Sequence, residues 1–222
     1  VNSVAFDVKG ADGSVTGNVI VDANQDYDMT MNIAGLRATT VADLLPQVSA
    51  MGQLDTLLDV RASGRIGPDG QVRRLDVETR AGAGTFRLEK VLPESIEFEG
   101  FAFKAKIRNG FDGISIKSGS VDFGGPELAF EISANRIGDK IRARIDADLR
   151  NMEMAGLSRY WPVNLGTSAR RWTTQNIRTG KVDEGKLGLV LELPVDDPLN
   201  PQIQSITGTL EYSGLDVSYF EA

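Results

Sequence analysis

The sequence predicts an all-β protein built as an antiparallel meander. Alternating apolar and polar residues recur along nearly the whole chain, in strands that follow one another at intervals of about 8 to 12 residues. The 222 residues include 24 glycines and are only 7% aromatic, a composition suited to many strands joined by tight turns. Since no series of long helices alternates with the strands, a parallel βαβ architecture is disfavoured.

The first half of the chain predicts two hairpins. Val4, Phe6 and Val8 alternate with polar residues before the turn GADG, after which the pattern resumes with Val15, Val19 and Val21. LLDVRASGRIG and VRRLDVETRA flank the turn GPDG, whose proline, aspartate and glycine are typical turn residues. At Gly100 the alternation changes parity, which predicts a bulge or a turn.

The second half predicts further strands and a final hairpin. ISIKSG, SVDFG, ELAFEISA, KIRARIDADLR and KLGLVLELP each alternate, and their opposite positions are mostly charged or polar. In ITGTLEYSGLDVSYF, the pair Ser213-Gly214 is expected at the turn of the last hairpin. The whole chain, residues 1–222, is interpreted as one β-rich segment of a longer protein, because it begins at Val1 without a leader.

Two helical insertions interrupt the strands. Residues 39–51 have apolar residues at helical spacing, although Pro46 restricts any helix there to a short or kinked one. A second helix is predicted near residues 166–178, with Thr167 or Ser168 as N-cap and Gly180 just past its end. Trp172 falls on its apolar stripe, so we expect Trp172 to lie against the sheet or to contact lipid, membrane or a partner.

Composition removes several classes of function. The net charge of -7 disfavours nucleic acid as a partner, because that affinity depends on neutralised phosphates. Cysteine and histidine are both absent, so thiolate chemistry, Fe–S clusters and imidazole ligands are excluded. With no nucleophile motif or phosphate-binding loop either, we expect a protein that is not an enzyme and needs no cofactor or metal.

Two groups of acidic residues are candidate sites, one for a calcium ion and one for catalysis. The oxygen-bearing residues from Asp22 to Asp28 have a calcium-loop spacing, but Tyr27 replaces the turn glycine and Ile33 replaces the bidentate glutamate, so a solvated turn is the preferred reading. Glu94, Glu97 and Glu99 are reminiscent of the paired carboxylates of glycosidases, yet the place of Glu97 and Glu99 opposite apolar strand positions predicts exposure to water. The apolar faces themselves must close into a barrel, pair as a sandwich or line an open trough, and composition leaves this choice open.

The stretch around the second helix carries a resemblance. Tyr160-Trp161-Pro162, Ala169-Arg170-Arg171-Trp172, Ile177, Gly180 and Val182 resemble the AsmA-like family of bacterial envelope proteins, in its YhdP-like branch. The likeness covers residues 159–219. It implies an elongated, twisted antiparallel sheet curled like a taco around a hydrophobic groove, with one or two short helices. Trp161, Pro162, Arg170, Arg171, Trp172 and Gly180 are the residues of the helix and cap motif.

The same resemblance implies a function. It predicts a periplasmic segment, in a parent protein anchored in the inner membrane, whose groove carries phospholipid acyl chains between inner and outer membranes. Membranes would be reached through other parts of the parent chain. The alternative is a non-catalytic β-scaffold for envelope or outer-membrane protein assembly, with envelope proteins as partners. The candidate groove residues are Phe6, Val19, Met29, Met31, Phe101, Phe103, Ile116, Phe130, Ile145, Leu189 and Leu191.

Overall fold

One large, open antiparallel sheet makes up most of the molecule. The computed structural model describes residues 2–10, 13–44, 51–88, 91–163, 166–197 and 201–218. The large sheet has eleven strands in the order β1-β2-β3-β5-β6-β9-β10-β11-β12-β13-β14, and a separate sheet holds β4, β7 and β8. Each strand of the large sheet therefore pairs with the next one along the chain that belongs to it. The predicted all-β, antiparallel meander is confirmed, and β1 and β14 are the free edges.

The elements follow one another along the chain as the alternation predicts. The large sheet contains β1 (Asn2–Gly10), β2 (Gly13–Val21), β3 (Tyr27–Arg37), β5 (Leu57–Ile66), β6 (Val72–Ala81), β9 (Gly100–Arg108), β10 (Gly113–Asp122), β11 (Glu127–Ile137), β12 (Lys140–Glu153), β13 (Ile177–Pro194) and β14 (Gln202–Val217). The small sheet contains β4 (Leu54–Asp55), β7 (Gly84–Phe86) and β8 (Ile96–Phe98). The helices are α1 (Ala38–Leu44), α2 (Leu157–Tyr160) and α3 (Thr167–Asn176), with the single turns η2 (Asn109–Phe111) and η3 (Met154–Gly156).

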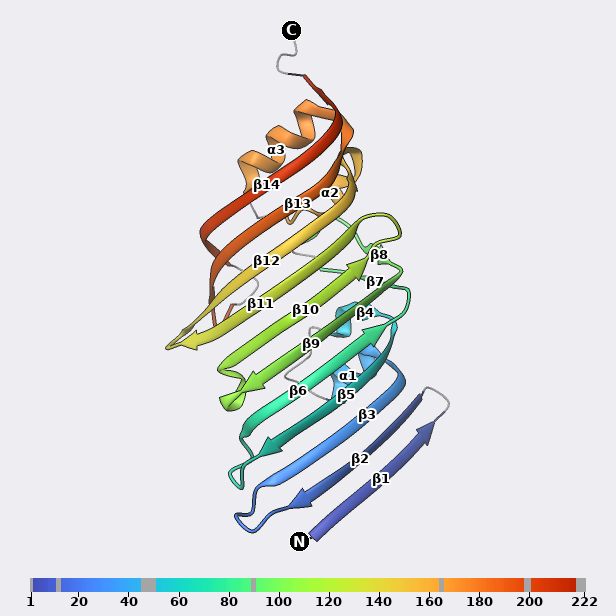
Figure 1. Ribbon diagram of the computed structural model, residues 1–222, viewed down its shortest axis with the longest axis vertical. Helices are drawn as coiled ribbons and strands as arrows, with labels where there is room; N and C mark the ends of the chain where they lie inside the picture. The colour runs from blue at the N-terminus through green and yellow to red at the C-terminus, as the bar shows by residue number, and fades with distance from the viewer. Residues whose placement is uncertain are drawn as a thin grey trace.

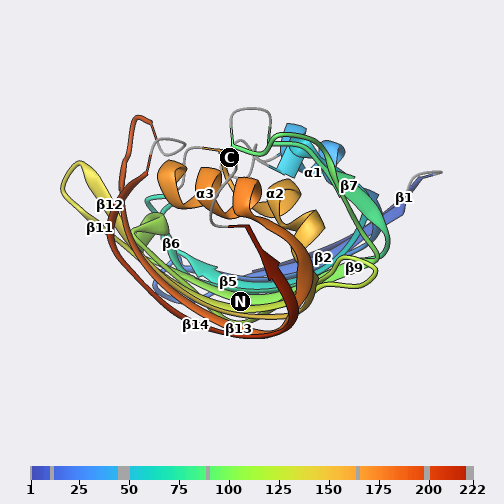
Figure 2. The same cartoon turned by 90° about the horizontal axis from the view of Figure 1, so that it is seen from above.

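The large sheet is curled into a trough. Figure 1 shows its strands stacked along the long axis, with β1 and β14 at opposite ends of the sheet. Figure 2, seen along that axis, shows the sheet curved in cross-section, with α1, α2 and α3 on its open side. The helices therefore lie on the concave side of the sheet.

Several local predictions are corrected. The parity change at Gly100 marks a change of sheet, because β8 belongs to the small sheet and β9 to the large one. The predicted final hairpin is wrong: β14 is one strand, and Gly214 has a φ of 61° beside a register shift against β13. A glycine in the left-handed region is typical of a β-bulge. ISIKSG and SVDFG likewise form one strand, β10, with a bulge between Ile116 and Ser118.

Candidate functional site

The inward side chains of the large sheet line up in continuous apolar rows. Cross-strand register gives a first row of Val4, Val19, Met29, Gly64, Leu75, Ile107, Ile114, Ala134, Ala143, Leu191 and Ile203. A second row contains Phe6, Gly17, Met31, Ala62, Val77, Ala105, Ile116, Ile132, Ile145, Leu189 and Ile206. Both rows cross every strand of the sheet without a charged residue.

Two further rows continue the apolar face. The third contains Val8, Val15, Ile33, Val60, Thr79, Phe103, Gly119, Phe130, Ala147, Leu187 and Gly208. The fourth begins at β3 and contains Leu36, Leu58, Ala81, Phe101, Val121, Leu128, Leu149, Gly185 and Leu210. We call the surface formed by these four rows the apolar face.

The apolar face is the concave one. Ile33, Leu58 and Val60 of the rows form a buried cluster with Ala38 and Val41 of α1. Because α1 lies on the open side of the trough in Figure 2, the rows that it contacts must face into the trough. The trough is therefore lined with hydrocarbon, while the charged side chains of the same strands point outward.

Every predicted groove residue lies on the apolar face. Val19, Met29 and Leu191 are in the first row; Phe6, Met31, Ile116, Ile145 and Leu189 are in the second; Phe103 and Phe130 are in the third, and Phe101 is in the fourth. Other residues of the apolar face, such as Val77, Ile114 and Ile132, were not among the predicted groove residues. The same alternation with a period of two residues indicates them.

Two groups of elements cover parts of the apolar face. Near the middle, α1 packs on the rows, and Phe98 of the small sheet has its ring centroid 5.5 Å from that of Phe101. Towards the C-terminal end, Tyr160 of α2 has its ring centroid 5.0 Å from that of Phe123, which follows β10. At the two edges the rows are open, since Val4 is 65% exposed and Leu210 is 60% exposed.

The helix pair α2 and α3 is held by a partly buried guanidinium contact. Nε of Arg170 donates to the carbonyl oxygen of Trp161 at 3.3 Å, and Nη2 donates to that of Ser158 at 3.1 Å. Arg170 of α3 thus satisfies carbonyl groups at the C-terminal end of α2, which have no partner within that helix. Arg170, which lies off the predicted apolar stripe of α3, therefore contacts backbone carbonyl groups of the described residues and neither solvent alone nor an acidic neighbour among them.

Other parts of the helix motif are also corrected. Trp172 is 47% exposed, so it does not anchor α3 by full burial, while Thr173 is half-buried. The N-cap is Gly166 in the left-handed region, without a side-chain cap. Gly180 lies inside β13, where a Cβ would stand 2.9 Å from the Cα of Leu215. Gly180 therefore allows β13 and β14 to approach each other closely.

The structure also places the rest of the helix and cap motif and the first helical insertion. Trp161 and Pro162 are half-buried between α2 and α3, and Arg171 is exposed on α3. The first predicted insertion contains α1, whereas residues 45–50 of that stretch lie outside the described residues.

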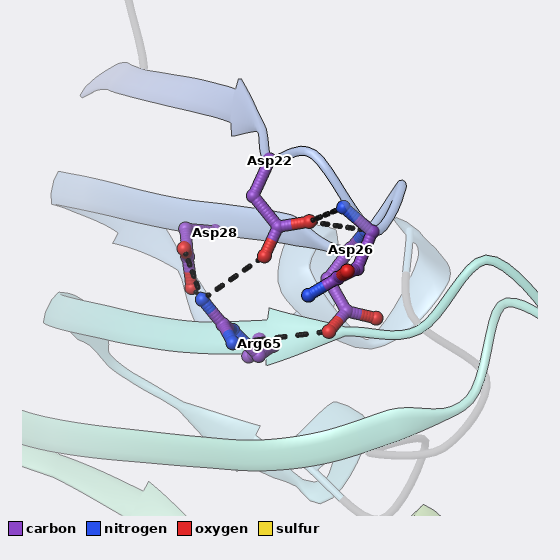
Figure 3. A network of polar contacts seen from close by, with 5 residues as sticks. Asp22, Asp26, Asp28 and Arg65 are labelled. Carbon is purple, nitrogen blue, oxygen red and sulfur yellow. Dashed lines mark hydrogen bonds and ion pairs between the residues drawn. The ribbon is translucent and has the colours of Figure 1, made fainter. Parts of the chain in front are cut away.

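The acidic run from Asp22 to Asp28 surrounds an arginine. Nε and Nη2 of Arg65 donate to the two carboxylate oxygens of Asp28 at 2.9 and 2.7 Å. Asp22 and Asp26 lie 3.4 and 3.8 Å from the same guanidinium, as Figure 3 shows. Hydrogen bonding from Arg65 lowers the pKa of Asp28. Arg65 thus pairs with all three carboxylates and offsets one of their three negative charges. No set of carboxylates among the described residues could hold a metal ion.

The glutamates considered for catalysis are separated by their surroundings. Glu97 and Glu99 are exposed beside buried Ile96 and Phe98, as their strand positions predict. Glu94 has its Oε1 3.0 Å from Nε of Arg159, which joins the loop before β8 to α2. This contact is structural, because it links two elements that cover the apolar face.

The fold and this site define an open, curled antiparallel sheet with one apolar, concave face. No protein-family model matches the chain, and no curated protein or solved structure matches it either. Among the described residues, no helix has the length and apolar character needed to cross a membrane.

Proposed function

We propose that this chain is a segment of a lipid-transfer protein whose apolar face carries phospholipid acyl chains between two membranes. The observation that carries this proposal is the continuity of the apolar rows, which run over all strands of an open, curled sheet. A protein that only needed a packed core would cover such a face along its whole length. Here the rows stay exposed at both ends.

The dimensions of the trough suit a sliding guest. Eleven strands at a spacing of about 4.8 Å give rows of about 48 Å. An acyl chain spans half of the bilayer's hydrocarbon core, or about 15 Å. The rows are therefore several times longer than the guest, so a chain has more than one position along them outside the stretches that α1, α2 and the small sheet cover.

The energetics favour binding without fixing a position. Each CH₂ group moved from water onto apolar surface gains about 0.8 kcal/mol. This gain is non-directional, and the rows offer no charged side chain that would hold a headgroup at one point. Phospholipid is thus the proposed ligand. As the resemblance implies, the proposed setting is the periplasm, in a parent protein held in the inner membrane and delivering lipid to or from the outer membrane.

Photocrosslinking from single positions tests this proposal. A photoreactive amino acid placed at Phe103 or Leu189 faces the trough, whereas the same amino acid at Lys104 or Val190 faces outward on the same strands. In the presence of radiolabelled phosphatidylethanolamine we expect lipid adducts from the inward pair and few from the outward pair. Equal labelling of both pairs, or no lipid adduct at Phe103 and Leu189, would contradict the proposal.

A second candidate function is a non-catalytic scaffold for assembly of envelope proteins. The observation that favours it is the pair of free edges, since every residue of β1 is exposed and β14 is exposed over nearly its whole length. An edge strand can accept a strand of a partner through backbone hydrogen bonds. The scaffold would copurify without lipid and would fail to take up fluorescent acyl chains, which separates it from the lipid-transfer proposal.

A further inference from the structure

A shallow hollow of about 680 Å³ lies on the outward face of the sheet, opposite the trough. It spans β3, β5, β6, β9 and β10. Its charged side chains are Arg61, Lys104, Lys106, Lys117, Asp76 and Glu78. Thr30, Asn32, Ser63 and Ser118 add hydroxyl and amide groups. We call this set the basic hollow, because its cations outnumber its carboxylates in a chain whose net charge is -7.

The two carboxylates of the basic hollow are already shared between cations. Glu78 lies 3.6 Å from Nζ of Lys104 and also accepts a hydrogen bond of 3.2 Å from Arg80. Asp76 lies 3.8 Å from Nζ of Lys106 and also pairs with Arg74. Each carboxylate thus faces two positive groups. The hollow retains a surplus of positive charge.

Two cations of the basic hollow have no counterion in the part of the chain that the structure describes. Within the described ranges neither Arg61 nor Lys117 forms an ion pair or hydrogen bond through its charged group. Lys117 follows inward Ile116 and is outward by alternation, while the β-bulge between Ile116 and Ser118 places Ser118 opposite outward Lys104, so that both residues line the hollow. Bulges commonly redirect a side chain at functional positions. Arg61 and Lys117 thus add positive charge to a surface that already has an excess of it.

The charge pattern of the basic hollow fits an anionic protein segment better than an anionic membrane or a nucleic acid. A membrane surface is disfavoured because peripheral binding usually combines charge with apolar anchors, and the apolar residues of this region, such as Val77 and Ala105, face the trough. A nucleic acid is disfavoured because Asp76 and Glu78 would face its phosphates. A protein segment can place carboxylates opposite the cations and donors opposite the carboxylates, since complementary charge patterns determine register and specificity.

We propose that the basic hollow is a docking site for an acidic, glutamate- or aspartate-rich segment of a partner protein. Arg61 and Lys117 are its main contacts, and Lys104 and Lys106 support them. The site lies on the opposite face from the trough, so it does not depend on lipid transfer. A partner bound there leaves the apolar face accessible.

Binding of a fluorescently labelled oligoglutamate peptide tests the proposal. Fluorescence anisotropy with the full 222-residue chain at low salt should detect binding that weakens as salt is added, because exposed charges are screened. The variant R61E/K117E should lower the affinity by about tenfold or more. The variant K9E/K186E makes the same change in net charge at outward positions elsewhere, and should change the affinity by less than about twofold.

The outcomes separate the alternatives. An equal effect of the two double variants would mean that the peptide senses only net charge, and would overturn the site. Absence of peptide binding by the unmodified chain would overturn it as well. Binding to phosphatidylglycerol vesicles that is lost in R61E/K117E, with no peptide binding, would overturn the protein partner in favour of a membrane. The neutral variant R61Q/K117Q, with its urea midpoint measured in parallel, keeps the test valid if charge reversal impairs folding.

Discussion

The ring of Phe130 lies on Gly119, its register partner on the neighbouring strand. A Cβ at Gly119 would stand 2.3 Å from Cε2 and Cζ of that ring. Phe6 and Gly17 repeat this arrangement near the N-terminal edge, where a Cβ would stand 2.3 Å from Cζ of Phe6. In both pairs glycine leaves room for an aromatic ring to lie flat on the apolar face. The glycines therefore leave the space on the apolar face that the two aromatic rings fill.

Substitution of Gly119 by alanine should be destabilising, because the added methyl group forces the Phe130 ring away from the sheet. Overpacking of this kind costs about 1 to 3 kcal/mol of unfolding free energy. Urea unfolding measures this loss. Gly125→Ala is the matched control, since a Cβ there meets nothing within 4 Å. Equal stability of the two variants would show that the ring can move without cost.

The contact of Arg170 with the end of α2 predicts a local effect. Arg170→Ala removes the donors to Ser158 and Trp161, which should cost about 1 to 3 kcal/mol because charged hydrogen bonds in a partly buried setting are lost. Amide hydrogen exchange should rise in α2 and α3 and stay unchanged in β1 to β3. Arg171→Ala removes an exposed neighbour on the same helix and should leave exchange as it is. A uniform rise across the sheet would argue against a local role.

The Asp28–Arg65 pair predicts acid sensitivity. Hydrogen bonds from Arg65 hold the pKa of Asp28 below its ordinary value of 3.8, so the folded state prefers the ionised carboxylate. The stabilisation is present above pH 3.8 and is lost as the pH falls through the lowered pKa. Asp28→Asn should therefore lower the urea midpoint at neutral pH and have a smaller effect at about pH 2.5.

A second variant shows whether Arg65 is the cause of that pH dependence. Arg65→Gln removes the cation, so in this background Asp28→Asn should produce little further change at neutral pH. An undiminished effect of Asp28→Asn in the absence of Arg65 would assign the acid sensitivity to another interaction.

The alternation of apolar and polar residues predicted most of the sheet. Because side chains on a strand alternate strictly between faces, one correct assignment such as Phe103 determines the face of its neighbours, and all predicted groove residues lie on one face. The alternating pattern does not predict whether the sheet closes into a barrel, packs as a sandwich or stays open as a trough. That choice depends on curvature and on which strands remain edges, and both are properties of the whole sheet.

The missed features have local causes. Alternation within β14 is regular from Ile206 to Tyr212, so the pattern just before Gly214 could not distinguish a hairpin turn there from a bulge. In β10 the signal was present: Ile114 and Ile116 have even numbers and Val121 an odd one, which indicates the bulge at Lys117. No pattern in the sequence indicated the contact of Arg170 with Ser158 and Trp161, because it depends on how α2 and α3 meet in space.

The free edge of β14 predicts self-association. Ile206 and Leu210 are 57% and 60% exposed and end the apolar rows beside unpaired backbone groups, a combination that attracts another strand. Sedimentation velocity should detect concentration-dependent oligomers of the chain, and the inward variant I206K/L210K should shift them towards the monomer. The outward variant T207K/T209K adds the same charge on the same strand and should have a smaller effect, because it leaves the apolar rows intact. Equal effects of the two variants, or a monomer at every concentration, would mean that apolar contact at this edge does not drive association.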